Sequence, residues 1–229
     1  AWIPGSYMVR DFAKNIIRLN AASDGREVAH GKLDKSTWRF EPVRGPLVVD
    51  YEVYAWDLSV RSAHFDNTHA YFNGTSLFLR VHGQEQLPCV LEIVAKKNSE
   101  VADWRIATSL NPLPANERCL GRFEASGYAD LIDHPVEIGR HADASFEAAS
   151  VPHGVSIYGR QNADLPRLTR DLVRICEQHV SLFGELPADR YLFLVMVVGD
   201  GYGGLEHTHS TSLLCSRNDL PIPGVAEVS

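Results

Sequence analysis

An unbroken run of eight apolar residues, Tyr191 to Val198, constrains the fold of this chain more than any other feature. The run lies between Pro187 and Gly199, and its length and its aliphatic and aromatic content are typical of a buried strand. The chain then leaves through a loop that contains Gly199 and Gly201. We therefore expect a buried strand here, followed by a glycine-rich exit.

The segment after this exit offers bare backbone and one negative charge. Gly203 and Gly204 have no Cβ atom, so another backbone can approach them closely. Leu205 follows, and the carboxylate of Glu206 can accept hydrogen bonds from an ammonium group. Together these four residues predict an edge where an extended peptide lies with its amino terminus anchored. A glycine turn followed by a solvated carboxylate is the simpler alternative.

Alternating apolar residues predict strands earlier in the chain. Between Leu47 and Val60 the apolar residues occupy odd positions first and even positions later, which indicates one long strand with a bulge. Shorter strands are expected at Leu77–His82, Val90–Ala95, Trp104–Leu110 and Gly121–Ser126. The absence of a convincing helical pattern between them favours a β-sandwich-like domain.

The sequence pattern changes at Asp133–Pro135, so we place a domain boundary there. Residues 1–132 form the predicted β-rich domain, and residues 133–229 contain an α+β portion. In the second part, Phe146–Ile157 predicts a hairpin that turns around Pro152-His153-Gly154. The fold class expected for the whole chain is mainly β with an α+β portion.

One amphipathic helix is expected in the second part. Asp164 suits the N-cap position, and Pro166 suits the first turn. Apolar residues then recur with the helical period of 3.6. Gly184 and Pro187 end the pattern.

Charge and cysteine content narrow the possible partners. The 229 residues carry a net charge of −7, which argues against nucleic acid or an anionic membrane as a partner, because both bind basic surfaces. No apolar run approaches the roughly 20 residues that span a bilayer. The four cysteines include no Cys-x-x-Cys pair, so we expect buried free thiols and a reducing, cytoplasmic compartment.

Metal-binding motifs are weak in this sequence. His-Glu-x-x-His, which places two imidazoles one helical turn apart, does not occur among the ten histidines. Two close pairs are present, His64 with His69 and His207 with His209. Each pair lacks an evident third ligand, so the sequence predicts no metal site in this chain.

Three motifs in one order resemble a known family. The first is Trp2–Tyr7 followed by Arg10–Ala13, and the second is Asp130–Glu137. The third is Tyr-Gly-Gly-Leu-Glu-His at Tyr202–His207, followed by Ser210 and Thr211. In these segments the chain resembles the glycyl aminopeptidase family of zinc metallopeptidases that carry a PDZ domain. Thr208 departs from the pattern, since many relatives have an arginine there.

The resemblance implies a zinc-dependent aminopeptidase that removes small amino-terminal residues from peptides. It assigns to Glu206 the contact with the free α-amino group, and to Gly203 and Gly204 the pairing with the substrate backbone. On strand parity, Glu206 and His207 face opposite sides, so His207 is expected to be structural.

The resemblance also implies that the chain is a fragment of a longer protein. In such relatives the zinc helix follows a stretch like Ser216–Pro221, and the sequence ends at Ser229. We therefore expect the first part of a thermolysin-like catalytic domain without its zinc, preceded by a sandwich that lacks its first strands. The missing catalytic and PDZ parts would be its partners, and this chain alone would be inactive.

Two rival functions remain open. One is a non-enzymatic, β-rich module that binds peptides or proteins through the edge near Gly203. The other is an independent metal hydrolase that uses Glu206, His207 and His209.

Overall fold

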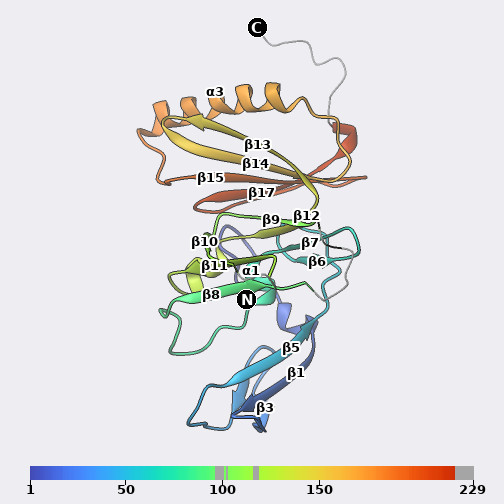
Figure 1. The fold of residues 1–229 in the computed structure, drawn as a ribbon, viewed down its shortest axis with the longest axis vertical. Coiled ribbons are helices and arrows are strands. Elements are labelled where there is room, and N and C mark those ends of the chain that lie inside the picture. Colours follow the sequence, from blue (N-terminus) through green and yellow to red (C-terminus); the bar gives the residue numbers. More distant parts are fainter. Residues whose placement is uncertain (96–100, 102, 116–118, 220–229) are drawn as a thin grey trace.

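The computed structural model describes residues 1–95, 101, 103–115 and 119–219, arranged as layers along one long axis (Figure 1). The predicted Ser216–Pro221 stretch therefore lies partly outside the described residues. The elements are η1 (Phe12–Asn15), β1 (Ile16–Ser23), β2 (Arg26–Glu27), β3 (His30–Lys32), β4 (Trp38–Phe40), β5 (Val48–Val53), β6 (Ala63–Phe65), β7 (His69–Phe72), α1 (Gly74–Leu77), β8 (Cys89–Ile93), β9 (Arg105–Thr108), β10 (Asn111–Leu113), β11 (Gly121–Ala125), α2 (Tyr128–Ile132), β12 (Val136–Gly139), β13 (His141–Ala148), β14 (Val151–Tyr158), α3 (Leu165–Phe183), β15 (Tyr191–Val198), β16 (Gly203–Glu206), β17 (Ser210–Ser216) and η2 (Arg217–Asp219).

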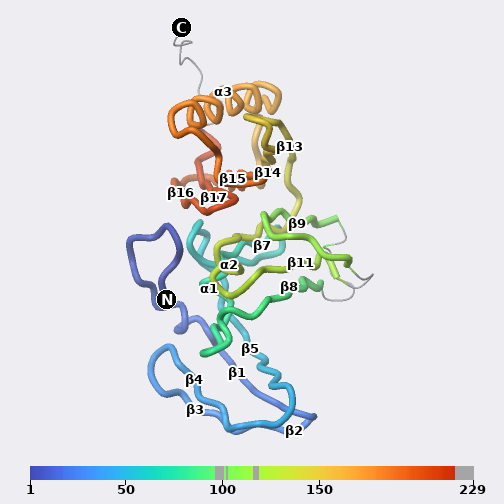
Figure 2. The backbone as a smooth tube through the Cα atoms, turned by 90° about the vertical axis from the view of Figure 1, so that its left-hand side faces the viewer, coloured from blue at the N-terminus to red at the C-terminus, as the bar shows by residue number. Residues whose placement is uncertain are grey.

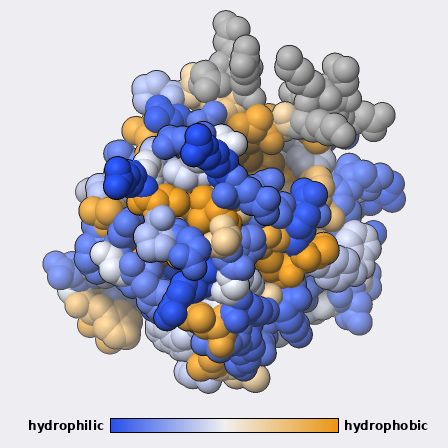
Figure 3. All heavy atoms as spheres, turned by 90° about the horizontal axis from the view of Figure 1, so that it is seen from below, coloured by the Kyte–Doolittle hydropathy of each residue, from blue (hydrophilic) through white to orange (hydrophobic). Residues whose placement is uncertain are grey.

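The lowest layer in Figure 1 contains a β2-β1-β5 sheet and the β3-β4 hairpin. The expected long strand from Leu47 to Val60 is wrong, because β5 ends at Val53 and the register shift lies in β1, between Ile16 and Arg18. Seen from below, apolar and polar residues are interspersed on the surface of the molecule (Figure 3).

A β-sandwich forms the middle of the molecule, as the alternating pattern predicts. One sheet has the order β6-β7-β12-β9 and the other the order β10-β11-β8. Phe72, Val136 and Ile138 of the first sheet pack against partly buried Leu91 and Ile93 of the second. The predicted strands near residues 90, 104 and 121 are confirmed as β8, β9 and β11.

The predicted strand at Leu77–His82 is wrong. The short helix α1 ends at Leu77, and the chain after it runs without regular structure. Buried Asn73 caps this helix, since its side chain accepts a hydrogen bond from the Thr75 N–H at 3.1 Å.

The upper layer is a five-stranded sheet of order β13-β14-β15-β17-β16, covered on one face by α3 (Figure 2). Its strands β14, β15 and β17 are parallel, and the predicted strand Tyr191–Val198 is confirmed as β15 at its centre. The predicted helix is also confirmed. Asp164 caps α3 by accepting from the Arg167 N–H at 3.0 Å, and Gly184 ends the helix with a φ of 95°.

The two faces of this sheet bury different cores. Val155, Ile157 and Val197 face the apolar stripe of α3. Met196 and Leu205 face the other way and form a core with residues from the start of the chain and the sandwich, including Ile3, Phe12, Val60 and Tyr71. The upper sheet is therefore fixed to the rest of the molecule through the face that carries Leu205.

The hairpin before α3 turns elsewhere than predicted. Ala149 and Ser150 form the turn with φ values of 50° and 63°, and Pro152 to Gly154 lie within β14. The boundary after residue 132 stays a prediction, although β12, which follows it, pairs with β7 and β9 of the sandwich. None of the described helices is long and apolar enough to cross a membrane. The expected burial of the thiols is wrong, because all four cysteines are partly exposed.

Candidate functional site

The glycine segment forms β16, an edge strand of the upper sheet. It pairs antiparallel with β17, with Gly204 opposite Leu213 and Glu206 opposite Thr211. Leu205 is fully buried, whereas the side chain of Glu206 is exposed on the opposite face. Strand alternation therefore separates an apolar anchor from a free carboxylate on adjacent residues.

His207 is buried beside Glu206, in agreement with the expected parity. Its Nδ1 lies 3.0 Å from Oδ1 of Asp133, and the Thr208 N–H donates to Oδ2 of the same carboxylate at 3.1 Å. The alternation of side chains expected of a strand stops after His207. Here the His207 N–H donates to the Ser210 carbonyl in a turn between β16 and β17. His207 and Asp133 thus hold the end of β16 against the end of α2.

The Asp133 carboxylate is stabilised in its charged form. Burial raises its pKa, but hydrogen bonds from His207 and Thr208 lower it by more, so the pKa lies below its usual value.

Glu206 lines an open hollow of ≈ 530 Å³. The hollow lies between the end of β16, the start of the chain and the segment around α2. Two further carboxylates, Asp130 and Asp133, face the same hollow, and no lysine or arginine lines it among the described residues. The Glu206 side chain has no ion-pair partner within the described part of the chain. The complete lining is Pro4, Gly5, Ala129, Asp130, Asp133, Glu206, His207 and Thr208.

Two contacts from the start of the chain and the sandwich fix the backbone of β16. Gly5 has a φ of 80°, and a Cβ at this position would lie 2.8 Å from the Glu206 carbonyl oxygen. Arg61 donates from Nη2 to the Gly204 carbonyl at 2.9 Å. One main-chain acceptor of the predicted peptide-binding edge is therefore already engaged. No local pattern predicts either contact, although Gly5 lies within the Trp2–Tyr7 motif, because each residue is more than 140 positions from its contact on β16.

The rival metal site at Glu206, His207 and His209 has no support in the geometry. His207 is bound to Asp133, and the ring of His209 stacks on that of His134 at 5.6 Å between centroids. Within the described residues, the group of three ligating side chains that does converge is His64, Asp66 and His69. Sequence reasoning noted the two histidines of that group and passed over Asp66.

Comparison with known structures shows which fold the chain shares. Two crystal structures of an M1 zinc metallopeptidase from Deinococcus radiodurans, one of them a mutant, have TM-scores of 0.55 and 0.53 and identities of 14% and 12% to this chain. Each match covers 86% of this chain and 50% of the other. The chain therefore shares its fold with part of these enzymes.

The family is defined more narrowly by sequence. Residues 1–140 match the Peptidase M61 N-terminal domain, and the chain belongs to that family. The crystal structure of an aminopeptidase N family protein from Idiomarina loihiensis is 45% identical, with a TM-score of 0.92, over all of this chain and 38% of that protein. The chain thus spans well under half the length of that relative. No curated protein matches it.

Proposed function

We propose that this chain supplies the substrate-anchoring edge of a zinc-dependent aminopeptidase, in which Glu206 binds the α-ammonium group of a peptide. The observation that carries the proposal is the exposed Glu206 carboxylate in a hollow that also contains Asp130 and Asp133. Three carboxylates create a negative potential that attracts a cation, and a carboxylate and an ammonium form a charge-assisted hydrogen bond. A peptide interior has no ammonium to offer, so such a site selects free amino termini.

The substrate backbone would lie beside Gly203 and Gly204, whose missing side chains allow close approach. Because Arg61 already binds the Gly204 carbonyl, the added peptide either uses the remaining main-chain groups of β16 or displaces this guanidinium. A mutant M1 zinc metallopeptidase of the same fold has been crystallised with a Tyr-Ser-Ala substrate, which agrees with peptide binding by this class.

The zinc ion and the hydrolytic groups would come from another part of the parent protein. The described residues around Glu206 provide no converging set of metal ligands, so this chain alone would bind no catalytic zinc and would not hydrolyse peptides. The preference for small amino-terminal residues and the PDZ domain of the parent belong to the same proposal, and the three sequence motifs support them. A cytoplasmic location is part of the proposal, and the cysteine pattern of the sequence supports it.

Peptide binding to this chain tests the anchoring role. A short glycyl peptide with a free amino terminus and its N-acetylated form are titrated by NMR against the wild type, Glu206→Gln and Glu147→Gln. The control removes an exposed carboxylate from β13, the opposite edge of the same sheet. We expect the free peptide to bind about 10–100-fold more tightly than the acetylated one, and Glu206→Gln alone to remove this difference. Equal binding of both peptides by the wild type would refute the assignment.

Activity of the parent distinguishes the enzyme from a binding module. A parent protein extended beyond Ser229 should release amino-terminal residues from an aminoacyl chromogenic substrate, whereas this chain should not. Selective binding of free amino termini by this chain, together with an inactive, zinc-loaded parent, would instead favour the non-enzymatic module.

A further inference from the structure

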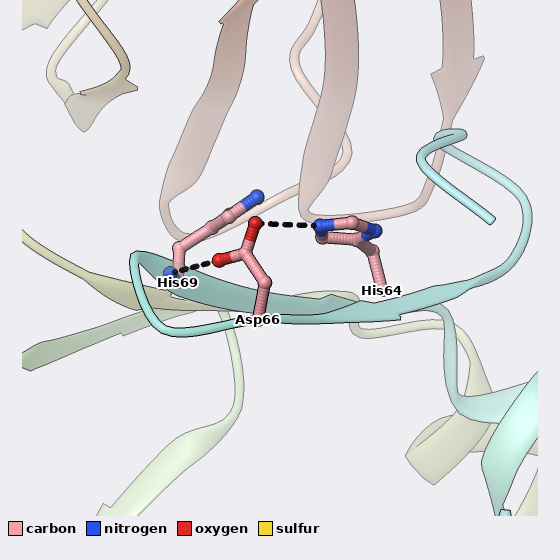
Figure 4. A group of neighbouring side chains, drawn as sticks. All are labelled: His64, Asp66 and His69. Carbon is pink, nitrogen blue, oxygen red and sulfur yellow. Dashed lines mark hydrogen bonds and ion pairs between the residues drawn. The ribbon is translucent and has the colours of Figure 1, made fainter. Parts of the chain in front are cut away.

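A second cluster of chemically active side chains lies apart from the Glu206 hollow, on the β6-β7 hairpin. His64 is on β6, Asp66 is in the connecting turn, and His69 begins β7. One ligating atom from each residue lies within 4.8 Å of the other two. Figure 4 shows the two imidazoles on either side of the Asp66 carboxylate, all on one face of the hairpin.

The carboxylate of Asp66 is held in a defined orientation. Its Oδ1 accepts hydrogen bonds from the Thr68 N–H at 2.7 Å, the Thr68 hydroxyl at 2.6 Å and the His69 N–H at 3.1 Å. Its Oδ2 lies 3.2 Å from Nε2 of His64. One oxygen is therefore fixed by the turn, and the other is directed toward the imidazoles.

A buried carboxylate orients the ring of His69 through one of its two nitrogens. Its Nδ1 lies 2.9 Å from Oε1 of Glu137, and both side chains are 2% exposed. The ring of Tyr158 stacks on the imidazole at 3.7 Å between centroids. A carboxylate on one imidazole nitrogen is the usual outer partner of a metal-ligating histidine, because it leaves the second nitrogen for the metal.

The ring of His64 is less completely hydrogen-bonded than those of two other buried histidines. In His134 and His141 both ring nitrogens have hydrogen-bond partners. In His64 the Nδ1 atom is buried without a partner among the described residues. Because Nε2 of His207 is likewise unpartnered within the described part of the chain, this feature alone does not mark a site; the nitrogen of His64 that an ion would contact is Nε2, 3.2 Å from Asp66.

We propose that His64, Asp66 and His69 form a binding site for a divalent transition metal, Zn²⁺ being the best fit, with Glu137 as the outer partner of His69. Two imidazoles and one carboxylate are a ligand set that Zn²⁺ favours, and metal–ligand distances of about 2.0–2.2 Å require ligand atoms about 3.3 Å apart. The contact between His64 and Asp66 already meets this spacing, and small side-chain rotations close the rest. The side chain of Asp66 is 26% exposed, so the ion and a water ligand can enter.

The place of this site in the fold indicates a structural role. Tyr158 belongs to β14 of the upper sheet, where it stacks on His69 and shares a 2.6 Å hydrogen bond with Thr68. An ion bound to the hairpin would fix the surface against which the upper sheet packs. The site is independent of the proposed aminopeptidase function, and it departs from the sequence-based expectation that this chain holds no metal.

Metal titration tests the proposal. The purified chain is stripped with a chelator and titrated with Zn²⁺ by calorimetry and with Co²⁺ by visible absorption, alongside His64→Gln, Asp66→Asn and Glu137→Gln. Exposed His30 on β3 supplies the control His30→Gln. Circular dichroism verifies that each variant is folded.

We expect one ion per chain and a rise in melting temperature on loading. Glu137→Gln should weaken binding by about 10–100-fold and loss of a ligand by more than that, whereas His30→Gln should have no effect. Absence of binding by the wild type at micromolar concentrations, or binding by His64→Gln and Asp66→Asn equal to that of the wild type, would overturn the proposal.

Discussion

Two histidine–carboxylate pairs lie where the upper sheet meets the sandwich, and the pKa values of their carboxylates are shifted in opposite directions. Asp133 accepts from His207 and from the Thr208 N–H, and its pKa is lowered. Glu137 is more deeply buried, and its Oε2 has no partner among the described residues. Burial raises the pKa of Glu137 by more than the hydrogen bond from His69 lowers it.

The histidine alone therefore does not decide the direction in which the pKa of its partner is shifted. The contact distances, 3.0 Å and 2.9 Å, are nearly equal. What differs is the supply of further donors, since Asp133 has a main-chain N–H on its second oxygen and Glu137 has none there. Asp133, whose two oxygens both accept hydrogen bonds, acts as an anchor, whereas Glu137, with one oxygen unpartnered in the described part of the chain, is better suited to orienting a histidine toward another ligand.

The largest effect is expected from removing the anchor. Asp133→Ala leaves buried His207 without its partner and the Thr208 N–H without its acceptor, so we expect a loss of about 3 kcal/mol in the free energy of unfolding. Urea denaturation measures the loss. The control is Asp171→Ala on α3, where an exposed pair with Arg167 should contribute less than about 1 kcal/mol. Equal costs for both variants would show that Asp133 is no anchor.

The amide variants of the two carboxylates compare the pairs directly. Asp133→Asn removes a charged acceptor and should cost about 1.5–3 kcal/mol. Burial raises the pKa of Glu137 and its Oε2 accepts no hydrogen bond among the described residues, so the amide replaces fewer charged hydrogen bonds and Glu137→Gln should cost at least about 1 kcal/mol less in the metal-free chain. Chemical denaturation with a chelator present tests both. If Glu137→Gln is the more destabilising variant, the contrast between the pairs is wrong.

The contribution of Asp133 to stability should depend on pH. The folded pKa of Asp133 lies below the unfolded value of about 3.9, so its stabilising contribution is complete above that pH and is lost as the pH falls through the folded pKa. The gap in unfolding free energy between the wild type and Asp133→Asn should stay constant from about pH 7 to about pH 5 and narrow below about pH 4. Denaturation curves across this range measure it, and a gap that widens in acid would contradict the assignment.

The sequence predicts those parts of this arrangement that depend on local signals. The limits of β15 and α3 follow from an apolar run, a cap and a terminal glycine. The turn at Ala149 was missed, because residues other than glycine seldom adopt positive φ values. The helix α1 was missed as well, since its stabilising cap is a buried asparagine that pattern reasoning does not weigh.

In the candidate sites, too, local features can be predicted from the sequence and contacts between distant residues cannot. The edge position of β16 is predicted from its two glycines, and the opposite directions of Leu205 and Glu206 follow from strand parity. The contact of His207 with Asp133 joins residues 74 positions apart, and that of His69 with Glu137 joins residues 68 positions apart. Such contacts depend on how the layers pack, which no local pattern records.

The smallest expected effect concerns the tyrosine above the second pair. Tyr158→Phe keeps the ring that stacks on His69 and removes only the hydroxyl that contacts Thr68, so we expect a cost of about 0.5–1.5 kcal/mol in the metal-free chain. Thermal and urea denaturation measure it, with Tyr202→Phe, at a side chain that is 96% exposed, as the matched control expected to change stability by less than about 0.5 kcal/mol. Because the stack remains, Zn²⁺ binding should persist in Tyr158→Phe. Loss of the ion from this folded variant would mean that the phenol oxygen, rather than the ring, completes the environment of His69.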